Sequence, residues 1–254
     1  MRRRLSSSWV LASCGILLLS SVCALPPFFS PGFIRNRAAA AGGGPNPPAS
    51  PLLNQKFEGT GYDNSETWTE SLGGGIVDED YTATVLDGSQ SLRIQNAAGG
   101  GVSYTAETFT AGGERWAFCK IRLTSLEAVA VTRSIAFWNN VGATLAAVEI
   151  NTSGTLHLVC GATTADTVDA MSTGTTYYMW FHYLKGTGAN AVADVGFSTT
   201  STRPTSGNKF VQITTGSPTT DAVEFAIHVW NNNNPSDFIY DRVYVDDEQI
   251  GDNP

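Results

Sequence analysis

The strongest candidate for a ligand-binding site is the segment of residues 223–230, in which apolar and other side chains alternate. Alternation with this period is typical of a β-strand, whose successive side chains point to opposite faces. One set is apolar and predicts a core face. The other set comprises Glu224, Ala226, His228 and Trp230. An aromatic ring, an imidazole and a carboxylate suit a sugar, which offers CH faces for stacking and hydroxyl groups for planar hydrogen-bonding partners.

A run of asparagines, residues 231–234, follows this segment directly and adds amide donors and acceptors. We predict that part of a glycan site is formed by His228, Trp230, Asn231, Asn232 and Asn233. The alternative is that Trp230 covers a sheet edge and that the asparagines form a turn.

Many short segments with strand patterning must position these side chains. Turn signals such as Gly73–Gly75, Asp87-Gly88 and Ser153-Gly154 separate them, and no long helical stripe interrupts them. We therefore predict an all-β fold, a two-sheet antiparallel β-sandwich (jelly roll). It forms a single domain over residues 52–254, a length that one all-β domain commonly reaches.

The first 24 residues have the pattern of a secretion signal. Arg2–Arg4 form a basic start, an apolar run begins at Trp9, and Val22–Ala24 offer small residues to a signal peptidase. The apolar run is shorter than the roughly 20 residues of a membrane-spanning helix. We predict that residues 1–24 are cleaved, giving a secreted or cell-surface protein without stable membrane insertion; an uncleaved anchor is the alternative. Residues 25–51, rich in Pro, Gly and Ala, predict a disordered linker.

The charge balance argues against nucleic acid as a partner. The net charge is −8, and it becomes −11 without residues 1–24, which hold three of the 15 basic residues and none of the 23 acidic ones. Binding to nucleic acid rests on phosphate neutralisation by Lys and Arg. Neutral glycans, cations or basic partners remain compatible with this charge.

Two cysteines remain after the predicted cleavage, Cys119 and Cys160. Each lies on the apolar side of its predicted strand, so a disulfide between them and a buried pair of free thiols both fit. Neither has a second Cys or a His at the spacing of zinc ligands.

Four segments in order carry a resemblance to a known family. They are Gly88–Ile94, Ile150–Leu158, Thr173–Tyr183 and Ile239–Val245. With these segments the chain resembles the concanavalin A-like lectin and glucanase superfamily, in particular its laminin-G-like jelly rolls. The resemblance implies two stacked, curved antiparallel sheets and, frequently, a glycan-binding or adhesive role, although a fold shared so widely does not determine function.

The same resemblance implies a structural calcium ion. Glycan-binding jelly rolls often tie their first and last strands with an ion held by an early Glu and a late Asp. Glu58 and Asp241 occupy comparable places in this chain, and carboxylate oxygens suit Ca²⁺. Alternatively, both are surface charges or pair with Arg242.

Signs of catalysis are weak in the sequence. A glucanase needs two carboxylates on one strand face, but Asp78–Asp80 and Asp246–Glu248 are consecutive and are read as solvated acids in turns. Residues 226–228, Ala-Ile-His, distantly resemble the Gln-Ile-His strand of polysaccharide lyases, without the Gln. We find no arginine-rich strand to accompany them.

The leading prediction is therefore a secreted, non-catalytic carbohydrate-binding or adhesion module, and not an enzyme. Its partner would be a glycan or a glycosylated surface. One alternative is a structural protein that assembles into an extracellular layer or fibre. A further alternative is a divergent polysaccharide hydrolase or lyase.

Overall fold

The computed structural model describes residues 48–97, 99, 101–128, 130–231, 235–252 and 254. All of them belong to one compact unit, Ala41–Pro254. The predicted signal and most of the predicted linker lie outside the described residues, so both stay predictions. No helix in the described part of the chain combines the length and apolar character needed to cross a membrane.

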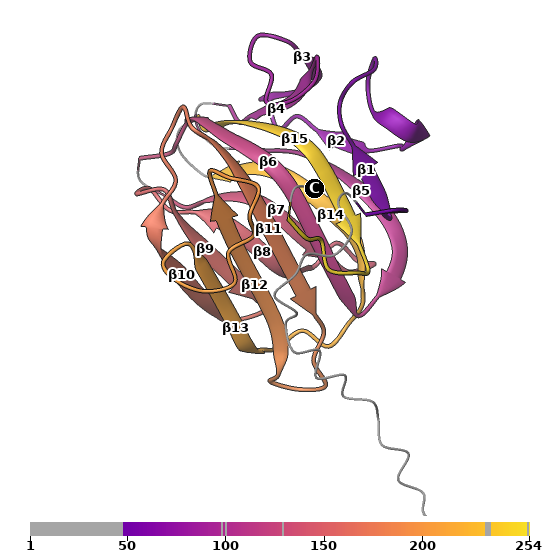
Figure 1. Ribbon diagram of the computed structural model, residues 1–254, viewed down its shortest axis with the longest axis vertical. Helices are drawn as coiled ribbons and strands as arrows, with labels where there is room; N and C mark the ends of the chain where they lie inside the picture. The colour runs from indigo at the N-terminus through magenta and orange to yellow at the C-terminus, as the bar shows by residue number, and fades with distance from the viewer. Residues whose placement is uncertain (1–47, 98, 100, 129, 232–234, 253) are drawn as a thin grey trace, which may run out of the picture. The chain divides into compact units, whose positions relative to one another are not determined.

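Two antiparallel sheets pack face to face as a sandwich (Figure 1), which confirms the predicted all-β fold. Sheet A has eight strands: in spatial order β13 (Phe210–Gly216), β12 (Ala191–Ser198), β11 (Thr176–Leu184), β6 (Glu114–Ser125), β15 (Asp237–Asp246), β4 (Ser91–Gln95) and β3 (Ile76–Tyr81), with β1 (Leu53–Gln55) paired to β15. A short 3-10 helix, η1 (Asp63–Ser65), follows β1.

Sheet B has seven strands: in spatial order β10 (Thr163–Ala170), β9 (Thr155–Cys160), β8 (Thr144–Ile150), β7 (Thr132–Trp138), β14 (Ala222–Asn231), β5 (Gly101–Gly112) and β2 (Thr69–Ser71). In Figure 1 this sheet forms the layer behind sheet A. We call the face of each sheet that is turned away from the other sheet its outward face.

The core lies between the sheets and takes one side-chain set from each strand. On β14 this set includes Phe225, Ile227 and Val229, as the alternation predicts. On β11 the inward set packs in the same core, and Trp180 joins a smaller apolar cluster on the outward face of sheet A. Burial of each large apolar side chain contributes about 1.5–3 kcal/mol, so both faces of β11 stabilise the fold.

The two cysteines are free thiols on opposite sheets. Cys119 lies on β6 and Cys160 on β9, and both are buried in the core. Burial raises the pKa of both thiols, to about 11 for Cys160. Since a nucleophilic cysteine must be a thiolate, these two act as core residues.

The β8–β9 hairpin shows how the predicted turns form. Gly154 donates its N–H to the carbonyl of Asn151 at 2.8 Å and has a φ of +89°. A Cβ at this position would lie 2.1 Å from the carbonyl oxygen of Met171, so only glycine fits.

Both acidic clusters differ from the prediction, because Asp246 is a buried residue of β15, 7% exposed, rather than a solvated residue of a turn, and the early cluster lies in a strand. Asp78, Glu79 and Asp80 are half-buried residues of β3 rather than solvated residues of a turn. The carboxylate of Asp80 accepts the N–H of Gly61 at 2.7 Å. This long-range contact, which the local sequence does not reveal, stabilises the strand that carries the acids.

Candidate functional site

Polar side chains line up in a row across the outward face of sheet B. In order over β5, β14, β7, β8, β9 and β10, this polar row consists of Tyr104, His228, Arg133, Glu149, His157 and Asp166. Neighbouring members lie opposite each other in the strand register, except between β14 and β7, where the register shifts. Strands in a sheet are about 4.8 Å apart, so the row spans about 24 Å. That length can contact several consecutive sugar units.

A bulge in β7 gives the polar row its only arginine. The register shifts between Arg133 and Ile135, which leaves Ser134 as an extra residue. Ser134 points inward and its hydroxyl lies 2.9 Å from that of the buried Tyr240. Arg133 points outward, where its guanidinium lies 4.6 Å from the ring centre of Trp230.

Arg133 is held by a neighbouring acid. Its Nε and Nη2 donate to the same carboxylate oxygen of Glu149, at 3.1 and 2.8 Å, and its Nη1 donates to the hydroxyl of Thr144 at 3.2 Å. The side chains of Arg133 and Glu149 are 17% and 13% exposed. This partly buried pair has a well-defined geometry and leaves little net charge at the centre of the row.

His228 is the most unusual member of the row. It is 1% exposed, and neither ring nitrogen has a hydrogen-bond partner among the described residues. Aromatic rings surround it: that of Trp138 lies 5.0 Å away and that of Tyr104 lies 6.0 Å away, centre to centre. The buried indole N–H of Trp138 also has no partner within the described part of the chain. Two unsatisfied polar groups thus lie in contact, where each costs about 1–3 kcal/mol.

The surroundings of His228 keep its imidazole neutral. Burial lowers its pKa, and the positive charge of Arg133 lowers it further, to about 3. A neutral imidazole has one nitrogen that accepts a proton and one that donates. His228 can therefore accept a hydrogen bond from a ligand or donate one to it at neutral pH, and as a proton acceptor it is a weak base because its pKa lies well below neutral.

The far end of the row is a smaller hydrogen-bonded group. His157 Nδ1 and Asn151 Nδ2 lie 2.8 and 2.9 Å from the same carboxylate oxygen of Asp166. Asp166 is 53% exposed, so this group is open to solvent.

The predicted glycan residues are only partly brought together. Trp230 is 38% exposed and contacts Arg133, whereas His228, predicted to face solvent, is covered by Tyr104 and Trp138. Asn231 is the last residue of β14. Asn232 and Asn233 lie outside the described residues.

The predicted glycan site did not include six residues of this site: Tyr104, Arg133, Trp138, Glu149, His157 and Asp166. For Tyr104 the local alternation misleads, because Val102, Tyr104 and Ala106 form the more apolar set although Ser103 and Thr105 are the buried residues opposite the core side chains of β14. The position of Arg133 depends on the bulge. Trp138 and Glu149 reach the site through strand pairing across the sheet, which no local pattern encodes.

The predicted calcium ligands, Glu58 and Asp241, both contact the loop before β4. Glu58 accepts the hydroxyl of Ser89 at 2.8 Å, and Asp241 accepts the backbone N–H of Asp87 at 2.8 Å and the hydroxyl of Ser91, the first residue of β4, at 2.9 Å. Burial raises the pKa of Asp241 to about 7, although three hydrogen bonds to its carboxylate act in the opposite direction. Among the described residues, no group of three or more His, Cys, Asp or Glu side chains is arranged to hold a metal ion. Donors contact both oxygens of the Asp241 carboxylate and one oxygen of the Glu58 carboxylate, and calcium at these residues stays a prediction.

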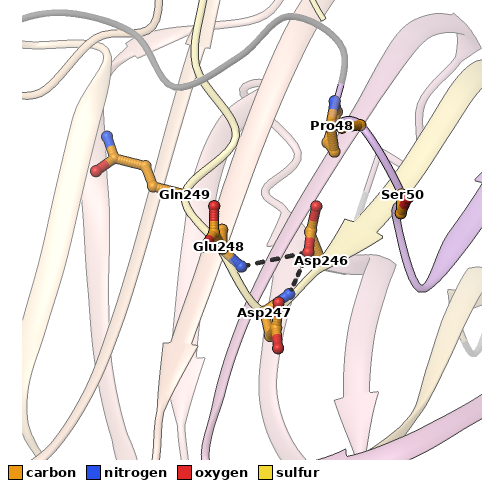
Figure 2. A pocket seen from close by; sticks show the side chains of 7 residues that line it. Pro48, Ser50, Asp246, Asp247, Glu248 and Gln249 are labelled. Carbon is orange, nitrogen blue, oxygen red and sulfur yellow. Dashed lines mark hydrogen bonds between the residues drawn. The ribbon is translucent and has the colours of Figure 1, made fainter.

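A hollow lies where β15 ends, beside the start of the described chain (Figure 2). It is lined by Pro48–Ser50 and Asp246–Gln249. One carboxylate oxygen of Asp246 accepts the backbone N–H groups of Asp247 and Glu248 at 2.7 and 3.3 Å. Three acids in sequence give it negative charge, and these contacts form a turn rather than a site for chemistry.

A second cluster lies on the outward face of sheet A. His182 stacks on Trp116 with ring centres 3.7 Å apart, and its two nitrogens lie 2.8 Å from Asp194 and 3.3 Å from Glu114. Arg203 lies 3.0 Å from Asp194 and over the ring of Trp116 at 4.5 Å. Burial lowers the pKa of His182, but the two carboxylates outweigh it, and the pKa is raised. Both nitrogens of His182 have partners.

Comparison with known proteins supports the fold. No protein-family model and no curated protein matches the sequence. An endo-β-1,4-glucuronan lyase from Trichoderma reesei has a similar structure, with a TM-score of 0.54 and 12% identity over 78% of this chain and 96% of the lyase. The alginate lyase from Aplysia kurodai gives a TM-score of 0.58 and 7% identity over 79% of this chain and 100% of the lyase.

A third similar structure is the alginate lyase Aly36B in complex with an alginate trisaccharide. Its TM-score is 0.51, with 12% identity over 78% of this chain and 98% of that lyase. The two-sheet β-sandwich is thus a fold that this chain shares with these lyases. Identities this low establish the fold alone, and a sialidase chain matches as well.

These neighbours overturn the leading functional prediction. The chain was expected to be a non-catalytic carbohydrate-binding or adhesion module and not an enzyme, but the structures it resembles include several polysaccharide lyases. The further alternative, a divergent polysaccharide lyase, fits them better. The prediction considered residues within single strands, so it did not consider pairs such as Tyr104 and His228, which meet only through the pairing of β5 with β14.

Proposed function

We propose that the protein is a divergent polysaccharide lyase whose active site is the part of the polar row around Tyr104 and His228. One observation carries the proposal. A neutral histidine with two unpartnered nitrogens lies opposite a tyrosine in the strand register, and one strand away lies the arginine of the row. Buried polar groups are rarely left unsatisfied without a functional reason. The structural likeness to polysaccharide lyases supports the same reading.

The reaction is a β-elimination on a sugar that carries a carboxyl group. A base takes the proton from the carbon next to the carboxyl group, and the C–H electron pair becomes a carbon–carbon double bond. The bond to the glycosidic oxygen breaks, and this oxygen leaves with its electron pair and takes a proton from an acid. No oxidant, reductant or water is consumed. Tyr104 and His228 supply the two proton-transfer groups, each within the range of residue types that act as general acids and bases.

Access to the pair requires a side-chain movement. His228 is 1% exposed, while Tyr104 and Trp138 are only partly buried. Rotation of either ring opens the imidazole to a ligand, and side-chain rotations are fast compared with catalysis. An oxygen of the ligand would then satisfy the indole N–H of Trp138 and a nitrogen of His228.

The proposal includes action outside the cell on a glycan. The predicted signal at residues 1–24 supports secretion, and the neighbours named above act on glucuronan and alginate. Assembly of the protein with itself stays a prediction that sizing at several concentrations checks.

The experiment is incubation of the purified full chain with a panel of uronic acid polysaccharides. Product is followed by the ultraviolet absorbance of the new double bond and by mass spectrometry. Elimination gives an unsaturated end, whereas hydrolysis adds water. Unsaturated oligosaccharides support the proposal, and saturated products or none from a folded protein contradict it.

Calcium stays a separate prediction for Glu58 and Asp241. Since a bound ion stabilises only the state that binds it, its test is the melting temperature with added Ca²⁺ and with a chelator. An unchanged melting temperature would contradict calcium binding at these two residues.

A further inference from the structure

Sheet B is poor in positive charge. Its seven strands contain a single Lys or Arg, Arg133, in the polar row. On the outward set of these strands lie three acids, Glu149, Asp166 and Glu224, whereas Glu107 lies opposite the core residue Phe225. An anionic polymer laid across this sheet would meet more like charge than opposite charge.

The one arginine is already neutralised. Two of its nitrogens donate to Glu149, the third donates to Thr144, and its flat face lies against Trp230. A free carboxylate of a substrate would have to compete with Glu149 for the guanidinium. It would also approach the carboxylate of Glu149 itself, at a cost for two like charges in a partly buried place.

The mechanism of elimination links the charge near Arg133 to the form of the carboxyl group that the site can accept. Removing a proton next to a free carboxylate builds a second negative charge on the same group, so the active site must supply a cation. When the carboxyl group is an ester, only one negative charge develops, on the carbonyl oxygen. Neutral hydrogen-bond donors can then stabilise it. The neutral imidazole of His228 and the indole N–H of Trp138 are donors of this kind, and both have no partner within the described chain.

We propose that the substrate is a polysaccharide whose uronic acid groups are esterified, and that Glu149 enforces this choice by neutralising Arg133. This inference rests on the proposed lyase function and names its substrate class. His228, which is neutral, takes the proton, the C–H electrons form the double bond, and the glycosidic oxygen leaves and takes the hydroxyl proton of Tyr104. The ester group is unchanged in the product.

The test uses one polysaccharide in two forms, fully methyl-esterified and de-esterified, with the full chain. The rate of unsaturated product is expected to be about tenfold or more higher on the ester. It should also depend little on salt, because no charge on the ester is screened. A higher rate on the de-esterified form overturns the substrate class and leaves the lyase function standing. No product from either form of a panel of such polysaccharides overturns both.

The variant Glu149→Gln tests the role given to Glu149. It leaves the charge of Arg133 uncompensated, so the rate on the de-esterified polymer should rise by about tenfold while the preference for the ester shrinks. Glu248→Gln, an exposed change at the end of sheet A, is the matched control and should leave the preference unchanged. An unchanged preference in folded Glu149→Gln contradicts the role of this residue. If the variant does not fold, the wild-type comparison of the two polymer forms still decides the substrate class.

Discussion

His182 and His228 occupy similar places, each on a central strand at the outward face of its sheet. Their side chains differ in their hydrogen-bond partners. His182 binds two carboxylates and stacks on Trp116. His228 lies among aromatic rings and has no hydrogen-bond partner within the described chain. An unpartnered buried group costs about 1–3 kcal/mol, so His228 lowers stability where His182 raises it. We infer that the outward face of sheet A serves stability and that of sheet B serves a ligand.

The C-terminal residues strengthen this contrast. Ile250 packs in the apolar cluster on the outward face of sheet A, and Trp180 donates its indole N–H to the carbonyl of Gly251 at 3.1 Å. Asp252 accepts the backbone N–H of Arg203 at 2.7 Å. The chain thus covers this face with its own end, whereas Trp230 on sheet B is 38% exposed.

Replacing His228 with glutamine should have the largest effect on activity. Loss of one proton-transfer group is expected to lower kcat by about 100-fold to 10,000-fold. Stability at neutral pH should not fall, because no hydrogen bond to a described residue is lost. Steady-state rates and denaturant unfolding check this. A variant as active as the wild type removes His228 from the chemistry.

Replacing His182 with glutamine should lower stability and leave activity unchanged, which is the reverse of the result expected at His228. His182→Gln removes a hydrogen bond from Asp194, which is 4% exposed, so the free energy of unfolding should fall by about 3 kcal/mol. The folded variant should keep its kcat. His157→Gln, whose partner Asp166 is exposed, is the control and should cost less than about 1 kcal/mol. Equal losses in the free energy of unfolding for His182→Gln and His157→Gln would contradict the stabilising role given to His182.

The contributions of the two histidines to the free energy of unfolding should also change with pH in opposite directions. The pKa of His228 falls to about 3 on folding. The unfolded chain therefore binds more protons below pH 6.5, and stability is lost as the pH falls from about 6.5 towards 3. The pKa of His182 is raised on folding, so its contribution is full below pH 6.5 and is lost as the pH rises through the folded pKa.

Denaturant unfolding of the wild type and of both glutamine variants measures these slopes. Between pH 6.5 and pH 5, the contribution of His228 should change by about 2 kcal/mol, since one pKa unit corresponds to about 1.4 kcal/mol. Slopes of the same sign for both histidines would contradict the assigned environments.

Trp230→Ala should have the smallest effect. Its ring is partly exposed and lies over Arg133, so its loss removes a stacking surface for a sugar rather than a reacting group. KM should rise by about tenfold, with kcat nearly unchanged and a stability loss of about 1 kcal/mol. A fall in kcat with unchanged KM would place Trp230 in the chemistry instead.

Local patterns predicted what lies within single strands. Alternation placed Phe225 and Ile227 in the core and Trp230 on the other side. These predictions succeed because the period of a strand fixes which side chains share a face.

The site depends on features that no local pattern contains. Tyr104 meets His228 only because β5 pairs with β14 in one register, and Arg133 turns outward only because Ser134 is bulged. Register and bulges follow from the whole sheet. The covering of His228 by Trp138 likewise needs the pairing of β7 with β14.

The most direct test of the account removes one oxygen from a matched tyrosine on each outward face. Tyr104 lies opposite His228 on sheet B, and Tyr178 lies beside Trp180 on sheet A. The measurement is the rate at which Tyr104→Phe and Tyr178→Phe form unsaturated product from the substrate that the wild type cleaves. We predict that Tyr104→Phe loses about 100-fold or more and that Tyr178→Phe keeps the wild-type rate. Full activity in folded Tyr104→Phe, or a loss confined to Tyr178→Phe, would contradict an active site on sheet B.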